Sequence, residues 1–462
     1  WLELRHKGTG KMSRLRVVAS VHRTSESVQR FRCDLQDPVE QRQGCIDSGV
    51  AVRRAGAAPT GLLTRQEEWR DDVLTPGLLV LSQWRLANHV RATIGAEAHR
   101  DQVSSTFRER RDSNNWEWKV ADRGNFSEGS TYVSGGVFTT VTGDLLKTDG
   151  GELQAQVGGR IGGFSAFAAD VPQFGDVAYD KAAAVGSASL RWQAHGLWTA
   201  WLSVNQGFRA PNLQESTVLG DTGSKIEVPN GDLDPESSVA LEAGVRVAHK
   251  RVQLTAVAFG NRLSDTIDER ELDAAEWAKL GLEAADVGTK PVVQRVNAGA
   301  GRFVGGELSL RGALPGGLAA WAQASVIRGE IDRDGGAVTA RRNPPPLGGA
   351  GLVWSVPGVK ELKIEAFSRF AAPASELHPS DERDLRICEN PGNPGGTYKD
   401  AGLVCPGTPG WVTANLRVVY RPTGRVRFDI AGLNLLDRVY RYHGSGIGEP
   451  GRGVALTLTG KL

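Results

Sequence analysis

Hydrophobic and polar residues alternate with a period of two along most of this chain. In residues 238–247, for example, Val239 and Leu241 occupy one parity, whereas Glu242 and Arg246 occupy the other. Successive side chains of a β-strand point to opposite faces, so this pattern predicts strands with one apolar and one polar face. We count seventeen such segments, and the sequence therefore predicts an all-β protein.

The predicted strands are joined alternately by short turns and long loops. The turns are predicted at 8–11, 86–88, 147–151, 194–196, 248–250, 314–317, 355–360 and 421–424. The long connections are predicted at 25–65, 107–130, 166–182, 210–236, 268–291, 332–345, 373–408 and 435–451. Strict alternation places all the turns at one end of the sheet and all the loops at the other. This asymmetry is typical of bacterial outer-membrane barrels, with short periplasmic turns and long extracellular loops.

Two architectures compete for such strands. In a soluble sandwich or propeller the apolar face is the core, whereas in a membrane barrel it meets lipid and the polar face lines a wet lumen. Many predicted strands run about 10–15 residues, which exceeds the mode of about 5–6 in soluble proteins. A tilted strand needs about 9–11 residues to cross a bilayer. The lengths therefore favour an antiparallel transmembrane β-barrel.

Tryptophans near the predicted turns are a second indication of a membrane boundary. Trp84, Trp192, Trp198, Trp321 and Trp354 each lie within a few residues of a short turn. Aromatic side chains form girdles at the two interfaces of outer-membrane barrels. The alternative for these residues is ordinary packing at strand ends.

Composition excludes several classes of protein. The chain has 462 residues, with 55 Lys and Arg against 53 Asp and Glu, so its net charge of +2 does not favour a nucleic acid or another polyanion as partner. No run approaches the roughly 18–20 consecutive apolar residues of a membrane helix.

The four cysteines fall into two loops. Cys33 and Cys45 lie in 25–65, and Cys388 and Cys405 lie in 373–408. Four cysteines allow three pairings, but each pair shares one loop, so two local disulfides are predicted if that surface is oxidising. A site with four thiolate ligands to a metal is the alternative, and the C-x-x-C spacing typical of such sites is missing.

Motifs that suggest catalysis or cofactor binding occur without the neighbouring structural elements that such sites need. Residues 446–451 match G-x-G-x-x-G, but Pro450 and the following strand exclude the helix that a dinucleotide site needs. His378, Asp381 and Asp384 are interpreted as a solvated or arginine-paired group rather than metal ligands. We predict no catalytic residue, no metal site and no cofactor, and the protein is not expected to be an enzyme.

Several motifs occur in a fixed order along the chain. Residues 207–213 read GFRAPNL, and residues 229–237 read PNGDLDPES. They are followed by NAG and GEL at 297–299 and 306–308, by Leu377, Asp381, Asp384, Arg386 and Ile387, by GTPGW at 407–411, by NLLD at 434–437 and by PGR at 450–452. In this order they resemble the paired boxes and final strands of TonB-dependent outer-membrane receptors. The resemblance assigns structural roles at strand–loop boundaries to Phe208, Arg209, Ala210, Pro211, Asn212, Pro235, Glu236, Asn434, Asp437, Gly451 and Arg452.

The resemblance implies a fold and a function. Family members are 22-stranded barrels that enclose an N-terminal plug, and the TonB complex drives import by pulling on a box ahead of the plug. Residues 1–462 are then the barrel domain, about 17 of an expected 22 strands, without the plug or the box. An odd strand count would leave the first and last strands parallel, and about five more strands restore an antiparallel closure.

The expected role is TonB-dependent import of a scarce nutrient across the bacterial outer membrane. The implied partners are outer-membrane lipid, the TonB complex through the absent plug, and a small ligand such as a metal chelate. Iron–siderophore complexes, cobalamin, glycans or similar nutrients remain open, but no histidine lies between Arg209 and Glu236, which disfavours haem. The alternative is a plugless binding or adhesin barrel without energised transport.

Overall fold

The computed structural model describes residues 1–33, 63–111, 115–120, 124–171, 174–194, 196–221, 225–282, 291–333, 336–392 and 395–460. Within these residues, 21 strands form one continuous sheet. Four of them are short and belong to long connections: β5 (Lys119–Val120), β10 (Gly220–Asp221), β11 (Ile226–Val228) and β16 (Gly336–Thr339).

The other seventeen strands of the 21 follow one another in chain order, each antiparallel to the next, so the predicted number is confirmed. They are β1 (Leu2–Lys7), β2 (Met12–Cys33), β3 (Leu63–Ala87), β4 (Val90–Arg111), β6 (Thr131–Thr148), β7 (Gly151–Val171), β8 (Gly175–Ala194), β9 (Trp198–Arg209), β12 (Glu236–Ala248), β13 (Val252–Leu272), β14 (Val292–Ala313), β15 (Leu318–Arg333), β17 (Leu347–Ser355), β18 (Leu362–Ala371), β19 (Trp411–Tyr420), β20 (Val426–Leu433) and β21 (Gly453–Gly460).

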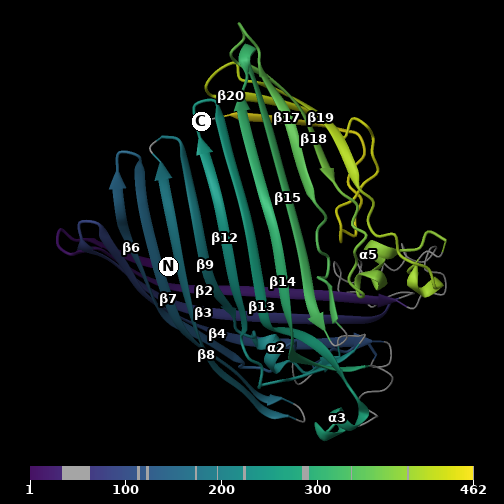
Figure 1. The fold of residues 1–462 in the computed structure, drawn as a ribbon. Coiled ribbons are helices and arrows are strands. Elements are labelled where there is room, and N and C mark those ends of the chain that lie inside the picture. Colours follow the sequence, from purple (N-terminus) through teal and green to yellow (C-terminus); the bar gives the residue numbers. More distant parts are fainter. Residues whose placement is uncertain are drawn as a thin grey trace.

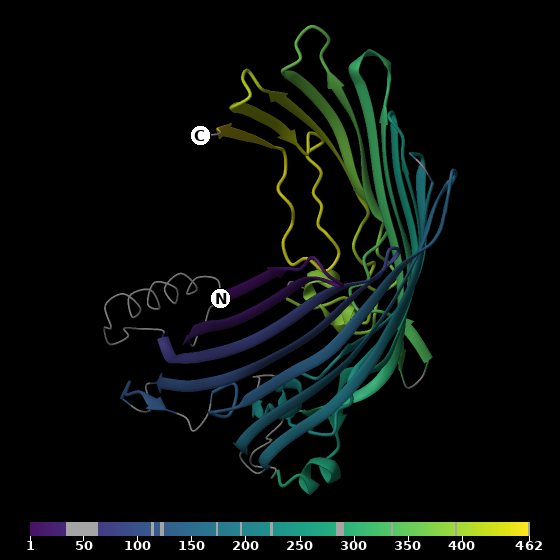
Figure 2. The ribbon, with the colours of Figure 1, turned by 90° about the vertical axis from the view of Figure 1, so that its left-hand side faces the viewer.

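The sheet curves into an open arc whose strands all run between the same two ends (Figures 1 and 2). The short connections, which define the turn end, are 8–11, 88–89, 149–150, 195–197, 249–251, 314–317, 356–361 and 421–425, in agreement with the prediction. The opposite, loop end carries the helices α2 (Leu213–Thr217), α3 (Ala274–Lys279) and α5 (Leu385–Cys388). Three 3₁₀ turns, η2 (Pro315–Gly317), η3 (Asp381–Arg383) and η4 (Lys399–Ala401), complete the helical elements of the described residues.

One predicted long loop, 166–182, is wrong. β7 and β8 continue to pair as far as Val171 and Gly175, so only residues 172–174 separate them. Asp170 and Pro172 have the chemistry of a loop, but the alternation that includes Ala166 and Tyr179 continues past them. These two side chains are almost fully buried beneath the loops, and this burial extends the hairpin.

Strands at the loop end are longer than the predicted 10–15 residues. β2 has 22 residues, β3 has 25 and β14 has 22. The sequence pattern detects only the amphipathic part of each strand, whereas backbone pairing continues into segments that are polar on both faces.

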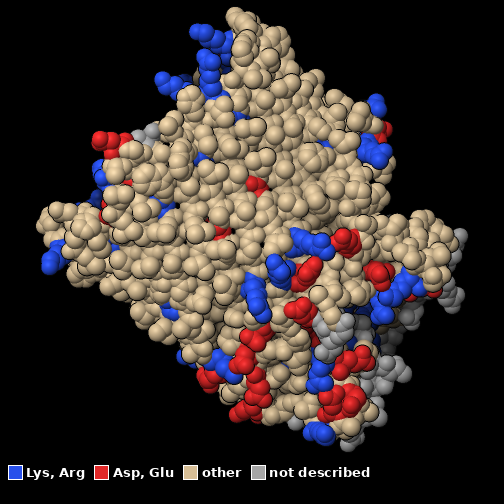
Figure 3. All heavy atoms as spheres, in the orientation of Figure 1, with Lys and Arg blue, Asp and Glu red and all other residues tan. Residues whose placement is uncertain are grey.

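The apolar face of the sheet points outward. Val137 is 59% exposed, Ile161 68% and Leu241 54%, and each belongs to the apolar parity of its strand. Figure 3 shows this outer face as a broad surface with few charged side chains; acidic and basic side chains gather together over the loop end, and Lys and Arg also stand at the opposite tip. The soluble architecture, in which this face would be the core, is therefore excluded. Among the described residues, no helix is both long enough and apolar enough to cross a bilayer.

Four of the five predicted girdle tryptophans share that outer face. Trp192 lies opposite Leu153 and Ala200, Trp198 and Trp354 are 40% exposed, and Trp84 pairs with Ala92 in line with exposed Ile94. The prediction for Trp321 is wrong. Trp321 lies opposite Gly351, which is next to outward-facing Leu352, so Trp321 has the inward parity of its strand and its ring faces inward.

Candidate functional site

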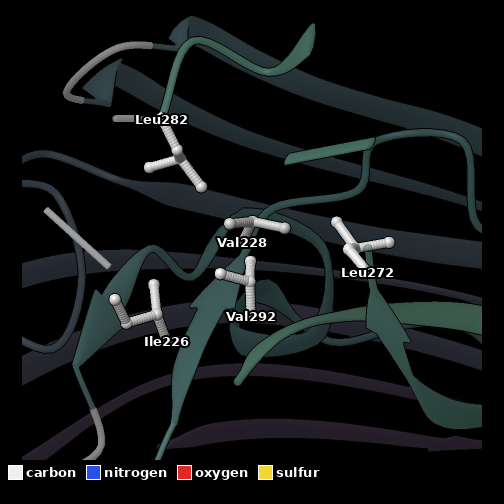
Figure 4. Close-up of a cluster of buried hydrophobic side chains, with 5 residues drawn as sticks. All are labelled: Ile226, Val228, Leu272, Leu282 and Val292. Atoms are coloured by element: carbon white, nitrogen blue, oxygen red, sulfur yellow. The ribbon is translucent and has the colours of Figure 1, made fainter. Parts of the chain in front are cut away.

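The loop end is an ordered structure with its own small apolar cores. β11 pairs in parallel with the loop-end extension of β14, so that Ile226 lies opposite Val292. Their side chains form a buried cluster with Val228, Leu272 and Leu282, which come from β11, from the end of β13 and from the 273–291 connection (Figure 4). This packing fixes the 210–235 and 273–291 loops over one side of the arc.

The segment at 208–212 joins β9 to this assembly. Arg209 binds Glu236 at 2.5 Å and Glu215 at 2.7 Å, which ties the end of β9 to the start of β12 and to α2. Asn212 caps α2: its side chain accepts from the Glu215 N–H at 2.9 Å, and the Glu215 carboxylate accepts from the Asn212 N–H at 3.0 Å. This reciprocal pair is a capping box, and it starts the helix.

The other residues of this boundary are packed rather than paired. Pro211 is fully buried, and Phe208 meets Phe164 edge-to-face with ring centroids 5.2 Å apart. Ala210 and Pro235 flank the two strand ends, where a ladder partner is no longer needed.

Asn297, in β14, forms hydrogen bonds that hold the 210–235 connection in place. Its side-chain amide donates to the carbonyl oxygens of Asp234 at 2.9 Å and Asp265 at 2.8 Å. Its side-chain oxygen accepts from the Asp234 N–H at 2.8 Å. One side chain therefore satisfies three backbone groups, two of Asp234 in the 210–235 connection and one of Asp265 at the irregularity of β13.

A second assembly surrounds the disulfide Cys388–Cys405, whose Cα atoms lie 5.5 Å apart. This predicted disulfide is present, whereas the predicted Cys33–Cys45 pair lies partly outside the described residues and stays a prediction. Nearby, Asp381 is 1% exposed and its carboxylate accepts from the Arg342 N–H at 2.7 Å. The 334–346 and 372–410 connections are joined in this way.

The carboxylates that the sequence placed with arginines do contact them. Asp384 binds Arg386 at 2.6 Å and Arg342 at 3.1 Å, whereas Asp381 pairs with Arg341 at 3.5 Å. His378 is buried, and its ring nitrogen accepts from the Ser380 N–H at 2.9 Å.

The last loop, 434–452, is built on its own motif residues. Asn434, 3% exposed, takes a left-handed conformation with φ 48° and accepts from the Arg438 N–H at 2.9 Å. Asp437 accepts from the Arg452 N–H at 2.8 Å. A Cβ at Gly451 would lie 2.9 Å from the same Asp437 carboxylate, so the site leaves no room for a side chain.

This last loop contacts the disulfide loop on the concave side of the arc (Figure 2). Arg441 donates to the Ile387 carbonyl at 3.2 Å, and the His443 ring lies 3.0 Å from the Thr408 hydroxyl. Burial lowers the pKa of His443 below its ordinary value of 6.5, although nearby Asp381 acts in the opposite direction. In the same loop region, hydrogen bonds from Thr397 lower the pKa of Asp400.

Three aromatic rings pack where the two loops meet the wall. Trp411, which is 7% exposed, has ring centroids at 4.3 Å from Tyr440 and 5.2 Å from Tyr442. They adjoin a cavity of about 420 Å³ on the inner face. Its polar lining includes Glu307, Ser309, Gln323, Ser325 and Arg369, beside Trp411 and Tyr442.

This cavity is the candidate ligand site of the described residues. It offers an acid, a base, neutral hydrogen-bonding groups and aromatic faces, which is the mixed lining of small-molecule pockets. Apart from Trp411, which lies in the GTPGW segment, and Glu307, which lies in GEL, its residues escaped the sequence reasoning. Their inward parity was the one signal that pointed to them.

An antiparallel sheet with an apolar outer face, a polar inner face and ordered loops at one end defines the class of outer-membrane receptor barrels. The family model described as "TonB dependent receptor-like, beta-barrel" matches residues 41–435, and the chain belongs to this family of outer-membrane receptors. No curated protein matches the chain.

Solved structures share the fold at low identity. A "Copper transporter OprC" superimposes with TM-score 0.70 at 16% identity over 99% of this chain and 64% of its own. The FrpB iron transporter of Neisseria meningitidis (F3-3 variant) gives TM-score 0.65 at 16% identity, covering 98% and 61%. The ferric yersiniabactin uptake receptor FyuA of Yersinia pestis gives 0.54 at 15%, covering 98% and 58%. The chain thus spans less than two thirds of the length of these proteins.

Proposed function

We propose that this chain is the barrel domain of an outer-membrane receptor that imports a scarce nutrient by TonB-dependent transport. Membership of the receptor family supports the class, and structural neighbours named as copper, iron and siderophore transporters or receptors support a small metal-containing cargo. The partners of this proposal are outer-membrane lipid, the TonB complex and one small ligand.

One observation carries the proposal: the long loops form a fixed receptor surface rather than loose connections. The Cys388–Cys405 disulfide closes the 372–410 connection on itself. The Arg441–Ile387 hydrogen bond and the aromatic contact of Trp411 with Tyr440 join this connection and the start of β19 to the 434–452 connection beside the cavity. A loop end held this way presents a preformed site to the cell exterior, because long loops of such barrels are extracellular.

The test compares cells that carry or lack the gene. We expect gene-dependent growth on one scarce iron, copper or carbon source, and loss of that growth when TonB is deleted. Trp411→Ala should weaken ligand binding at the cell surface, whereas Trp116→Ala, in the connection that follows β4 and outside the cavity lining, serves as the matched control. Ligand binding that is retained while uptake is independent of TonB would instead identify a binding barrel without energised transport.

A further inference from the structure

The outer face of β13 and β14 carries two arginines directly opposite each other. Arg262 and Arg302 are register partners in these antiparallel strands, both side chains are exposed, and we call them the arginine pair. They have the outward parity of Val239, which lies opposite Arg262, and of Val304, and these two valines are 46% and 39% exposed. Both guanidinium groups therefore stand on the side of the wall that meets lipid.

The arginine pair lies at one border of the apolar band. Along both strands it is ten residues from the Val252–Gly312 pair at the turn end. A tilted strand crosses a bilayer in about 9–11 residues. Every outward position between the two pairs is uncharged, from Leu254 to Gly260 on β13 and from Val304 to Leu310 on β14. A membrane that covers these positions places both arginines at the level of its headgroups on the loop side.

Arginine recurs at this border on other strands. On β15 the outward positions from Ala320 to Val326 are uncharged, and the next outward residue is Arg328. On β4 the outward positions from Val90 to Ala98 are uncharged, and the next is Arg100. Figure 3 shows basic side chains where the uncharged wall meets the charged loop end, in the region where Figure 1 labels β13 and β14.

The carboxylates nearest to the arginine pair do not neutralise it. Glu330 lies opposite Arg302 on β15, but it binds Arg328 at 3.2 Å, and Glu376 approaches the same Arg328 at 3.9 Å. Asp332, the next outward residue of β15, forms no ion pair with Arg302. Among the described residues, no hydrogen bond and no ion pair reaches either guanidinium of the arginine pair.

Other outward arginines at the loop end are neutralised by the fold itself. Arg23 of β2 binds Asp72 of β3 at 3.1 Å, and Arg108 of β4 binds Glu68 at 2.8 Å. Strand register places both arginines on the outer face, because Arg23 lies opposite exposed Leu74 and Arg108 shares the parity of Arg100. The arginine pair thus differs from them in its partners and not in its face.

An anion between the two guanidinium groups removes an unfavourable contact. Like charges directly opposite on neighbouring strands destabilise a sheet, and the Cβ atoms of such partners are about 5 Å apart. Guanidinium groups bind phosphate through paired N–H donors. A lipid phosphate lies at the level of the arginine pair, and the acyl chains of the same molecule cover the apolar wall below. A soluble anion supplies the charge but leaves that wall uncovered.

We propose that the arginine pair is a binding site for the phosphate group of a phosphorylated lipid in the outer leaflet, whose acyl chains lie against Val239 and Val304. The long loops of such barrels are extracellular, which assigns this border to the outer leaflet. The inference rests on the outer-membrane location given in the proposed function. It does not depend on the nutrient or on TonB.

Native mass spectrometry of the purified full-length protein in detergent measures lipid retention. The probes are dioleoyl phosphatidic acid, dioleoyl phosphatidylcholine, whose choline compensates the phosphate charge, and inorganic phosphate, which has no acyl chains. We expect phosphatidylcholine to bind about tenfold more weakly than phosphatidic acid, and inorganic phosphate not to displace phosphatidic acid. Equal retention of the two lipids, or displacement by inorganic phosphate at the same concentration, overturns the proposal; the second result would identify a site for free anions.

A matched pair of variants makes the test specific. R262Q/R302Q should weaken the binding of phosphatidic acid about tenfold. The control R23Q/R108Q removes the same charge from the same face and end, where each arginine has its own carboxylate, and should bind like the wild type. Heat-modifiable migration confirms that each variant is folded. Unchanged binding by R262Q/R302Q refutes the site, and an equal loss in the control would mean that the overall charge of the loop end attracts the lipid.

Thermal unfolding in lipid vesicles gives a second measurement. Because the two arginines repel each other, R262Q/R302Q should be at least as stable as the wild type in pure phosphatidylcholine. Phosphatidic acid should then raise the unfolding temperature of the wild type and not that of R262Q/R302Q, since a ligand stabilises only the protein that binds it. The same rise in both proteins contradicts a site at the arginine pair.

The lipid measurements and the growth screen fail separately. If R262Q/R302Q retains phosphatidic acid while growth depends on the gene and on TonB, this inference is refuted and import stands. If no nutrient depends on the gene and TonB, import is refuted, and the purified protein still decides whether the arginine pair binds lipid phosphate. Recovery of the protein outside the outer membrane would refute both.

Discussion

Asn297→Ala tests whether a single side chain holds the 210–235 loop in place. The substitution removes hydrogen bonds to the Asp234 carbonyl, the Asp265 carbonyl and the Asp234 N–H, at 2.9, 2.8 and 2.8 Å. Each bond contributes about 1 kcal/mol net, so complete loss costs about 3 kcal/mol. Asn297 is half-buried, so hydrogen bonds to water replace part of the lost bonding. We therefore expect the free energy of local opening of this loop to fall by about 1.5 kcal/mol.

Hydrogen exchange is the measurement, because it reports local opening without unfolding the barrel. A cost of about 1.5 kcal/mol raises the exchange of amides in 225–235 about tenfold. Amides of β12 and β13 should not change. Asn88→Ala, at an exposed turn on the opposite end, is the control. If exchange of 225–235 in Asn297→Ala stays within about twofold of the wild type, hydrogen bonding by Asn297 does not hold the loop, and the apolar cluster around Val228 does.

Three further predictions concern other parts of the fold. The double substitution Cys388→Ser/Cys405→Ser should destabilise the 372–410 loop by about 3 kcal/mol, because the disulfide closes a separation of 17 residues. The measurement is proteolysis of 372–410, which should become faster. Unchanged cleavage would mean that the ion pairs alone hold this loop in place. Leu241→Arg should destabilise the barrel by about 2–4 kcal/mol in lipid vesicles while inward-facing Ser238→Arg does not, and equal effects would contradict the assignment of faces. Because the pKa of His443 is lowered, the neutral form is favoured in the fold, so its contribution is present above pH 6.5 and is lost as pH falls. Proteolysis of 434–452 should therefore accelerate below pH 6.5 in the wild type but not in His443→Gln. If the proteolysis rate depends on pH in the same way in both proteins, His443 is not the group that destabilises this loop at low pH.

The period-two pattern predicted the sheet well where one face meets lipid. Each of the eight short turns lies where the alternation stops, because a strand that leaves the apolar band at the turn end has nothing further to pair with. At the loop end the same signal fails. β2 and β3 pair from Arg23 and Leu74 onward through mainly polar residues, and backbone hydrogen bonding leaves no trace in hydropathy.

The candidate site was predictable only at its boundaries. The family resemblance named Arg209, Asn212 and Asn434, which lie where a strand becomes a loop. Asn212 and Asn434 bond backbone groups there, and Arg209 binds the carboxylates of Glu215 and Glu236. The contact of Trp411 with Tyr440 and Tyr442 joins separate segments of the chain, and no local pattern encodes it. Trp321 shows the limit of position alone, since nearness to a turn placed it in the girdle and its parity places it inside.

The net charge of +2 does not favour a polyanion as partner, and the strand register shows how the charges behind that sum are distributed. Net charge describes the surface of a protein only when both signs are mixed on the same face. Here the carboxylates are used mainly at the loop end, where Glu67 and Asp384 each neutralise more than one arginine. Of the cations that this leaves unpaired among the described residues, Arg246 and Arg311 stand on the inner face at the turn end, and Arg262 and Arg302 stand on the outer face at the edge of the apolar band. A chain that is almost neutral overall therefore separates its ion-paired and its unpaired cations along the strands, and the parity of each arginine shows this where the net charge does not.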